Sequence, residues 1–198
     1  MGKKKHLGQI EELFKKSPVV DFQSIKRRVK SESYAKTLVN YLIKRGKISK
    51  LAKGRYTRYN ETALAVFCFQ PAYLGLQSAL SYYRIWEQET IPVILTARPV
   101  RTGIRDVNGS NIFIRKVRKR YMFGFSYEQE GDFYIPYSDL EKTVIDMVVF
   151  RQRMDKAVLK KLKEKINKKT LITYLKRYPK KTRDRVRKVL NPGKPKAI

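Results

Sequence analysis

Apolar residues in the first 60 positions recur at three- and four-residue spacing, which is the repeat of an amphipathic helix. Leu7, Ile10 and Phe14 share one such face. The pattern predicts three short helices, over residues 6–16, 22–29 and 31–45. Asp21 precedes the second helix and a serine begins the third, and both residue types cap helix N-termini. Gly46 should end the third helix, because glycine readily adopts the left-handed conformation found there.

Two short alternating segments follow, at 48–51 and 54–57, with a turn between them. Three helices and a basic hairpin, in this order, are typical of a winged helix-turn-helix, whose third helix enters the major groove of DNA. The outward face of the third helix carries side chains of the types that contact bases and phosphates. The alternative is a basic, solvated face on a structural domain. The candidate DNA-binding residues are Ser33, Lys36, Thr37, Asn40, Tyr41 and Lys44 on the helix, and Lys50, Lys53, Arg55 and Arg58 on the hairpin.

β-Branched runs in the middle of the chain predict a small antiparallel sheet of three or four strands. The expected strands cover residues 91–96, 111–117, 122–127 and 132–135. Apolar segments at 61–69 and 76–85 predict helices before the sheet. A further helix over 139–150 should carry Glu141 and Lys142 at the start of its polar face. The predicted fold class is therefore α+β, with a mixed α/β part after the winged helix.

The C-terminal segment repeats apolar residues at helical spacing and predicts two or three short helices, over residues 155–166, 171–175 and 183–190. Val158 and Leu162 belong to a stripe that should pack on the middle of the chain. The outer faces of these helices are nearly all basic, which suggests a second surface for phosphates or for an acidic partner. Its candidate residues are Lys160, Lys161, Lys165, Lys168, Lys169, Arg183 and Arg187.

Charge is concentrated at the two ends of the 198-residue chain. Residues 1–60 carry a net charge of +13, residues 61–150 a net charge of zero, and residues 151–198 a net charge of +16. This distribution predicts three parts: a DNA-binding domain, a neutral core domain and a basic helical extension. The two basic ends should bind a polyanion. We expect nucleic acid rather than a membrane, because membrane binding usually needs a helix with a free apolar face, and the apolar residues at both ends are used in packing.

Candidate catalytic chemistry is sparse. One cysteine and one histidine, Cys68 and His6, cannot form a zinc cluster, and we expect a buried thiol and an inert imidazole. Asp139, Glu141 and Asp146 could form an acid–base or metal-binding set, but the first two diverge around a helix, and charges near a helix start usually serve as caps or surface groups. The sequence therefore predicts a protein that is not an enzyme, with no cofactor and no metal.

Three segments, in order, resemble the AbiEi family, the antitoxins and transcriptional regulators of type IV toxin–antitoxin systems. They are the hairpin at 48–56, the Ser-Ala-Leu helix at 76–83, and the Glu-Lys-Thr…Asp helix at 137–146. The resemblance implies a DNA-binding N-terminal winged helix, a mixed α/β second domain, repression of the protein's own operon and opposition to a nucleotidyltransferase toxin. It also implies that Glu141-Lys142-Thr143 is a structural signature. The strongly basic C-terminus departs from what the family leads us to expect.

The sequence thus predicts a DNA-binding transcriptional regulator, an autorepressing antitoxin whose partners are double-stranded DNA and a nucleotidyltransferase-type toxin. Two alternatives stay open: an architectural protein that binds nucleic acid without reading sequence, and an antitoxin that acts by direct contact with a toxin. No run of 18 apolar residues exists, so no membrane partner is expected, and the location should be cytoplasmic. The sequence leaves the oligomeric state open.

Overall fold

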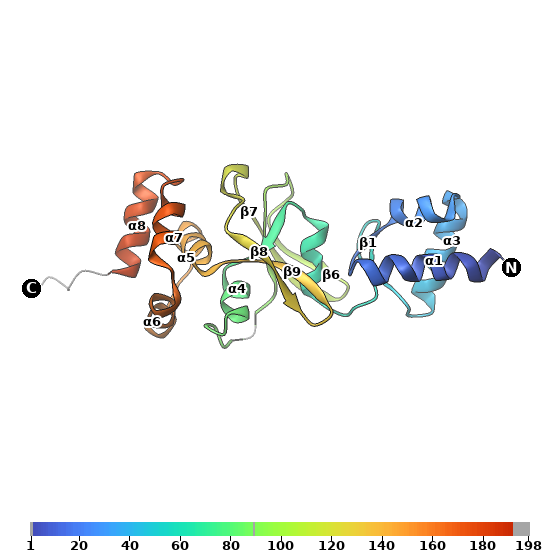
Figure 1. Cartoon of the computed structure of the whole chain (residues 1–198), viewed down its shortest axis with the longest axis horizontal. Helices are drawn as coiled ribbons and strands as arrows, with labels where there is room; N and C mark the ends of the chain where they lie inside the picture. The colour runs from blue at the N-terminus through green and yellow to red at the C-terminus, as the bar shows by residue number, and fades with distance from the viewer. Residues whose placement is uncertain (1, 89, 192–198) are drawn as a thin grey trace, which may run out of the picture.

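The N-terminal part of the chain contains three helices and a three-stranded antiparallel sheet. The computed structural model describes residues 2–88 and 90–191. The helices are α1 (Gly2–Lys16), α2 (Phe22–Val29) and α3 (Glu32–Lys44), and the strands are β1 (Val20–Asp21), β2 (Ser49–Ala52) and β3 (Arg55–Thr57), in the order β1-β3-β2. These elements lie at one end of an elongated molecule (Figure 1).

Local capping explains where these helices begin and end. The side chain of Asp21 accepts a hydrogen bond from the Ser24 amide, and that of Ser31 accepts one from the Tyr34 amide. Lys30, between α2 and α3, has a left-handed backbone with a φ of 60°. The inward faces form a buried cluster that includes Ile10, Phe14, Ile25, Leu38, Leu42 and Tyr56. The one unexpected element is β1, because Val20 lies in an apolar connection too short to show alternation and pairs with Tyr56.

The centre of the molecule is a six-stranded sheet in the order β6-β7-β5-β4-β9-β8. Its strands are β4 (Ala72–Leu74), β5 (Val93–Thr96), β6 (Gly103–Val107), β7 (Ser110–Lys116), β8 (Phe125–Glu130) and β9 (Phe133–Ser138). The hairpin β8–β9 is antiparallel, as expected from the sequence. The pairs β6–β7 and β4–β5 are antiparallel too, although the sequence did not predict β4 or β6. The pairs β4–β9 and β5–β7 are parallel, so the sheet is larger than predicted and mixed.

Short helical segments connect the strands. The predicted helix at 61–69 is a 3₁₀ segment, η1 (Thr62–Cys68), and the one at 76–85 is the shorter α4 (Gln77–Tyr82). A second 3₁₀ segment, η2 (Lys119–Tyr121), precedes β8, which starts three residues later than expected. The strand boundaries shift here because Gly124, with a φ of 68°, interrupts the apolar run.

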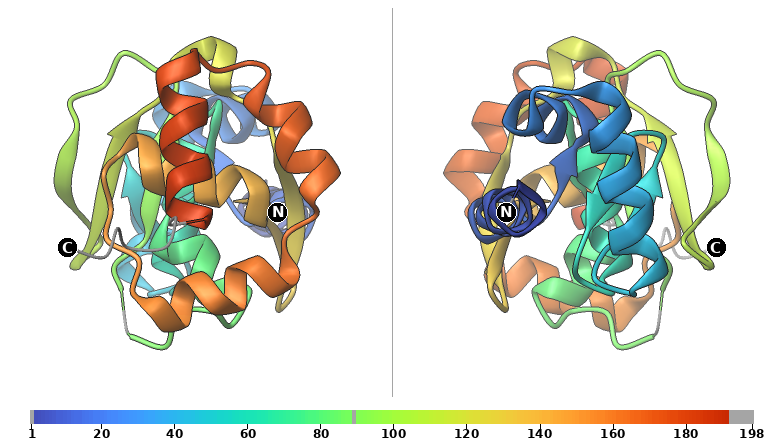
Figure 2. Two further views of the ribbon diagram at one scale, coloured as in Figure 1. Left: turned by 90° about the vertical axis from the view of Figure 1, so that its left-hand side faces the viewer. Right: turned by 90° about the vertical axis from the view of Figure 1, so that its right-hand side faces the viewer.

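Four helices complete the chain at the end opposite α1–α3: α5 (Leu140–Val149), α6 (Lys156–Lys165), α7 (Lys168–Leu175) and α8 (Lys180–Leu190). Figure 2 shows α6–α8 from this end, arranged around α5. Val158 and Leu162 are buried as predicted, in a cluster with Val144, Ile145 and Tyr73. Residues 151–191 therefore share a hydrophobic core with α5 and the sheet. The chain is an α+β protein, while its division into three domains stays a prediction.

Candidate functional site

The predicted DNA-binding side chains of α3 lie on one exposed face of that helix. Ala35, Leu38, Val39 and Leu42 occupy the opposite, buried face. Tyr41 is half-buried, and the Arg45 guanidinium lies 5.6 Å from its ring centroid. The exposed candidates are Ser33, Lys36, Thr37, Asn40 and Lys44.

Two of these exposed side chains already have partners within the protein. Glu32, in the first turn of α3, accepts from Lys26 at 2.6 Å and pairs with Lys36 at 2.9 Å. These two lysines lower the pKa of Glu32 to about 2, so its carboxylate is charged at neutral pH. Thr37 donates its hydroxyl to the backbone oxygen of Ser33. Asn40 and Lys44 are exposed at the centre and the end of the same helix.

The hairpin β2–β3 presents its basic side chains beside α3. Lys50, Lys53 and Arg58 are exposed, while Arg55 is half-buried and lies 3.5 Å from the Asp21 carboxylate. A groove of about 790 Å³ runs between the start of α2, α3 and the hairpin turn. Its basic lining residues are Arg27, Lys36, Lys53 and Arg55. Arg27 is not among the residues predicted to bind DNA. The sequence feature that could have indicated it is its place in the basic last turn of α2.

The predicted basic side chains of the C-terminal helices differ in their surroundings. Lys161 pairs with Glu87 at 2.7 Å, and Lys165 donates to the Tyr83 carbonyl oxygen at 3.3 Å. Lys168 and Arg187 line a common groove of about 620 Å³ with an apolar floor. Lys160 and Lys169 are exposed on α6 and α7, and Arg183 is half-buried on α8.

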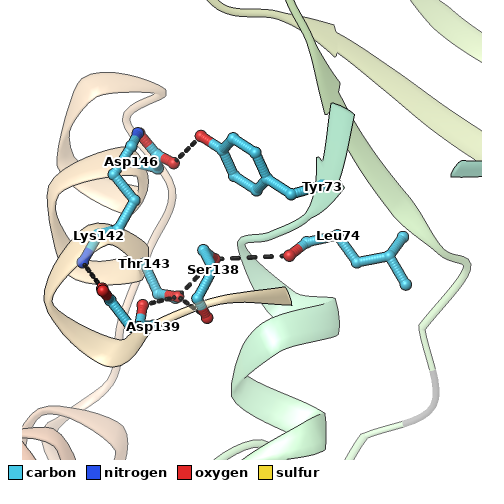
Figure 3. A network of polar contacts seen from close by, with 7 residues as sticks. All are labelled: Tyr73, Leu74, Ser138, Asp139, Lys142, Thr143 and Asp146. Atoms are coloured by element: carbon cyan, nitrogen blue, oxygen red, sulfur yellow. Dashed lines mark hydrogen bonds and ion pairs between the residues drawn. The ribbon is translucent and has the colours of Figure 1, made fainter. Parts of the chain in front are cut away.

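A buried charge pair lies in the core beneath α5. Lys142 is fully buried and Asp146 is 2% exposed. Asp146 Oδ1 accepts from the Lys142 ammonium, and its Oδ2 accepts from the Tyr73 hydroxyl at 2.7 Å (Figure 3). Burial raises the pKa of Asp146 and lowers that of Lys142, while each charge opposes the shift of the other.

The expectation that Lys142 is a surface residue is wrong. The sheet and α6–α8 enclose α5, so that every residue from Glu141 to Val148 is buried. The Lys142 ammonium lies 5.4 Å from the ring centroid of Tyr73, 5.5 Å from that of Phe123 and 6.0 Å from that of Tyr178. Aromatic faces attract cations, and these rings partly replace water around the charge.

The carboxylates that were weighed as an acid–base set are engaged in structural hydrogen bonds. Asp139 Oδ1 caps α5 by accepting from the Lys142 amide, and its Oδ2 accepts from the Tyr174 hydroxyl, both at 2.7 Å. Glu141 accepts from the backbone amide of Asn167, which leads into α7. Ser138 and Thr143 bond to each other through their hydroxyls at 2.8 Å (Figure 3). This network joins β9, α5 and α7.

Other candidate chemistry is also limited. Among residues 2–88 and 90–191, no group of three or more His, Cys, Asp and Glu side chains could hold a metal ion. Cys68 is buried, and burial raises the pKa of its thiol to about 11, so it is protonated at neutral pH. In the described part of the chain, no helix is long and apolar enough to cross a membrane.

Comparison with known proteins shows a shared fold. The crystal structure of the RV2827C protein from Mycobacterium tuberculosis is similar to this chain, with a TM-score of 0.60, 11% sequence identity, and coverage of 94% of this chain and 76% of that one. An identity this low supports the likeness of fold alone. No protein-family model and no curated protein sequence matches the chain.

The buried pair predicts a large asymmetry between single variants. Replacing Asp146 with Ala leaves the Lys142 charge uncompensated and should lower the free energy of unfolding by about 3–5 kcal/mol. Replacing Asp184, which pairs with Arg187 at 3.8 Å on the surface, should change it by less than about 1 kcal/mol. Urea unfolding of the two alanine variants measures this difference. Equal losses would contradict the burial of the pair.

Proposed function

We propose that this chain is a sequence-specific DNA-binding transcriptional regulator whose residues 1–60 act as a winged helix-turn-helix. The observation that carries the proposal is the exposed polar face of α3 beside a basic hairpin. Side chains that contact bases would come from α3, and the hairpin would supply phosphate contacts. Its main candidates are Asn40 and Lys44 on the helix and Lys50 and Lys53 on the hairpin, all exposed.

The order of elements supports this proposal. A short strand between the first and second helices pairs with the last strand of the hairpin, so β1 fixes the hairpin against the start of α2. The Phe22 amide also donates to the Gly54 oxygen at 2.9 Å, which joins α2 to the turn. The two-residue connection between α2 and α3 turns sharply at Lys30. These features set α3 and the hairpin side by side around a basic groove.

We further propose that the regulator is the autorepressing antitoxin of a type IV toxin–antitoxin pair. This step rests on the three AbiEi-like segments. The Glu141-Lys142-Thr143 segment has the structural contacts that such a signature requires, since all three residues are buried and hydrogen-bonded. In this proposal the protein is not an enzyme and needs no cofactor. A nucleotidyltransferase-type toxin is the proposed protein partner.

A second candidate function is non-specific binding to nucleic acid, which the formal net charge of +29 favours. Selection of bound duplexes from a random pool separates the two. A regulator should enrich one sequence, whereas an architectural protein should enrich none. A third candidate, direct contact with a toxin, is favoured by the apolar floor of the groove on α7 and α8 and by the exposed Ile172. Mixing the protein with the toxin in the absence of DNA tests it.

We expect α3 to carry specificity and the hairpin to carry general affinity. Asn40→Ala should weaken binding to the selected sequence by about 1–3 kcal/mol and change binding to random DNA little, because an amide reads a base edge. Lys53→Ala should weaken both equally, since it contacts phosphate. Gln88 is an exposed amide side chain in the central part of the chain, so Gln88→Ala is the matched control and should change neither binding. If Asn40→Ala weakens binding to the selected sequence and to random DNA equally, the side chains that recognise the bases lie elsewhere.

Binding to DNA should depend strongly on salt. If six or more phosphates are contacted, the logarithm of the binding constant should fall against the logarithm of salt concentration with a slope of about −5 or steeper. Fluorescence anisotropy over a salt series gives this slope. A value near −1 would mean that most of the positive charge is unused in the complex.

The exposed lysines of the C-terminal helices should extend the DNA footprint. Lys160→Glu, Lys168→Glu and Lys169→Glu together should weaken binding to long DNA more than to a minimal site. Glutamates in the first turn of α7 are compatible with its dipole, so the fold should persist. The matched Lys→Gln triple variant should lose about half as much in log K, because it removes half as much charge. Unchanged affinity of both triple variants for long DNA would assign these helices to protein binding.

A further inference from the structure

A cluster of basic residues lies in the otherwise neutral middle of the chain. Five of the ten Lys and Arg residues between positions 61 and 150 fall within residues 115–120. This segment contains the end of β7 and the start of η2. Lys116, Arg118 and Arg120 line a cavity of about 340 Å³ between this segment, α5 and the start of α8. All three side chains are exposed at the cavity.

The start of α8 forms the opposite wall. Pro179 and Thr182 line the cavity there. Within residues 2–88 and 90–191, no side chain caps the 11-residue helix α8, and its first turn contains no acidic residue. The Thr182 and Arg183 amides donate to the Pro179 oxygen, and the dipole of the helix gives this end a positive potential, which favours an anion.

The floor of the cavity supplies an independent sign of a ligand. Tyr178 is 5% exposed and lines the cavity, and among the described residues its hydroxyl has no hydrogen-bond partner. A buried hydroxyl without a partner is unfavourable, so an acceptor oxygen in the cavity would satisfy it. Tyr178 is held in place by stacking on Tyr121, with ring centroids 4.2 Å apart. The Arg120 guanidinium lies 4.8 Å from the Tyr121 centroid.

The one acidic group in the cavity is already neutralised. Asp146 lies at its floor, but both of its oxygens accept hydrogen bonds, from Lys142 and from Tyr73. The groups left for a ligand are therefore positive or donors: three cations, the positive end of the α8 dipole, and the hydroxyls of Tyr178 and Thr182. A set composed of donors matches a group that carries several acceptor oxygens and more than one negative charge.

We propose that this cavity binds the terminal phosphoryl group of a phosphorylated small molecule. Its recessed floor suits a terminal phosphate, whose oxygens point outward, better than a phosphodiester within a duplex. In the bound state Arg118 and Arg120 contact the phosphoryl oxygens from one wall and the α8 N-terminus from the other, while Tyr178 donates from the floor. The proposal does not rest on the proposed DNA binding by residues 1–60.

Isothermal titration calorimetry of the full-length protein with tripolyphosphate tests the site. We expect saturable binding at one site. Tyr178→Phe removes only the hydroxyl and Arg118→Gln removes one charge, and each should raise Kd by about tenfold. Lys163→Gln removes the same charge from the exposed side of α6, away from the cavity, and should leave Kd within about twofold of wild type. Circular dichroism checks that each variant is folded.

A second measurement separates a ligand-binding role of Tyr178 from a structural one. Because its hydroxyl has no partner in the described part of the protein, Tyr178→Phe should unfold at the same urea concentration as wild type, or a higher one, in the absence of phosphate. Tyr174→Phe removes a hydrogen bond to Asp139 and should unfold at a lower concentration. A clear loss of stability in Tyr178→Phe without phosphate would overturn the assignment.

Three other results would also overturn the proposal. The first is an absence of saturable tripolyphosphate binding. The second is an equal loss of affinity in Lys163→Gln, which would indicate general attraction of anions to a basic protein. The third is that the protein binds a short DNA duplex but not tripolyphosphate, and that Arg118→Gln weakens the binding of the duplex. That outcome would assign the cavity to a phosphate of nucleic acid.

Discussion

An ammonium group transferred from water to a protein core is unfavourable unless opposite charge and hydrogen bonds replace its hydration. In this chain Lys142 meets that requirement through groups supplied by three separate parts of the sequence. Asp146 comes from the same helix, Tyr73 from β4, and Tyr178 from the connection between α7 and α8. The Lys142–Asp146 pair has all of these contacts only when the sheet covers one side of α5 and the C-terminal helices cover the other. The sheet and the C-terminal helices therefore fold around α5 as one body.

Backbone geometry around α5 depends on the same enclosure. Gly124 lies so close to this helix that a Cβ atom there would stand 2.8 Å from the Tyr174 ring and 2.9 Å from Lys142 Cβ. Its φ of 68° is also in the left-handed region, so a side chain would be strained as well as crowded. The Gly124 oxygen accepts from the Asp139 amide at 2.9 Å, directly before α5 begins. One glycine thus allows the loop before β8 to cross the start of α5.

Periodicity in the sequence located most elements but not their pairing. Helices α1–α3 and the hairpin could be predicted because their apolar faces repeat and their caps are local. Strand β4 was missed because three residues are too few to show a pattern, and β6 because it contains Gly103 and Asp106 and leaves Ile104 exposed. Parallel pairing of β4 with β9 joins segments more than 50 residues apart, and no local pattern encodes it. The candidate DNA-binding residues could be chosen by helix face alone. Lys36 lies at i, i+4 from its partner Glu32, a spacing that can be read from the sequence, whereas the partner of Lys161, Glu87, lies 74 residues away and could not be foreseen.

The position of Lys142 shows a related limit. Lys142 and Asp146 have the i, i+4 spacing of a surface ion pair, and near a helix start that pattern is usually exposed. Whether such a pair is exposed or buried depends on what covers the helix, and here the covering helices follow later in the chain. The cavity at Arg118 and Tyr178 could not be foreseen for the same reason, since its walls are more than 50 residues apart in sequence.

The hairpin that we assign to DNA is also attached to the central body. Leu51 of β2 is 5% exposed and packs in the same cluster as η1 and the strands β4, β5 and β7, rather than with the core of α1–α3. Tyr59, just after β3, meets the Phe133 ring of β9 at a centroid distance of 4.9 Å. Because well-packed contacts of this kind resist independent movement, the hairpin keeps a fixed orientation to the sheet. The neutral middle of the chain therefore does more than separate two basic ends: it determines how the exposed lysines of α6 and α7 are oriented relative to α3.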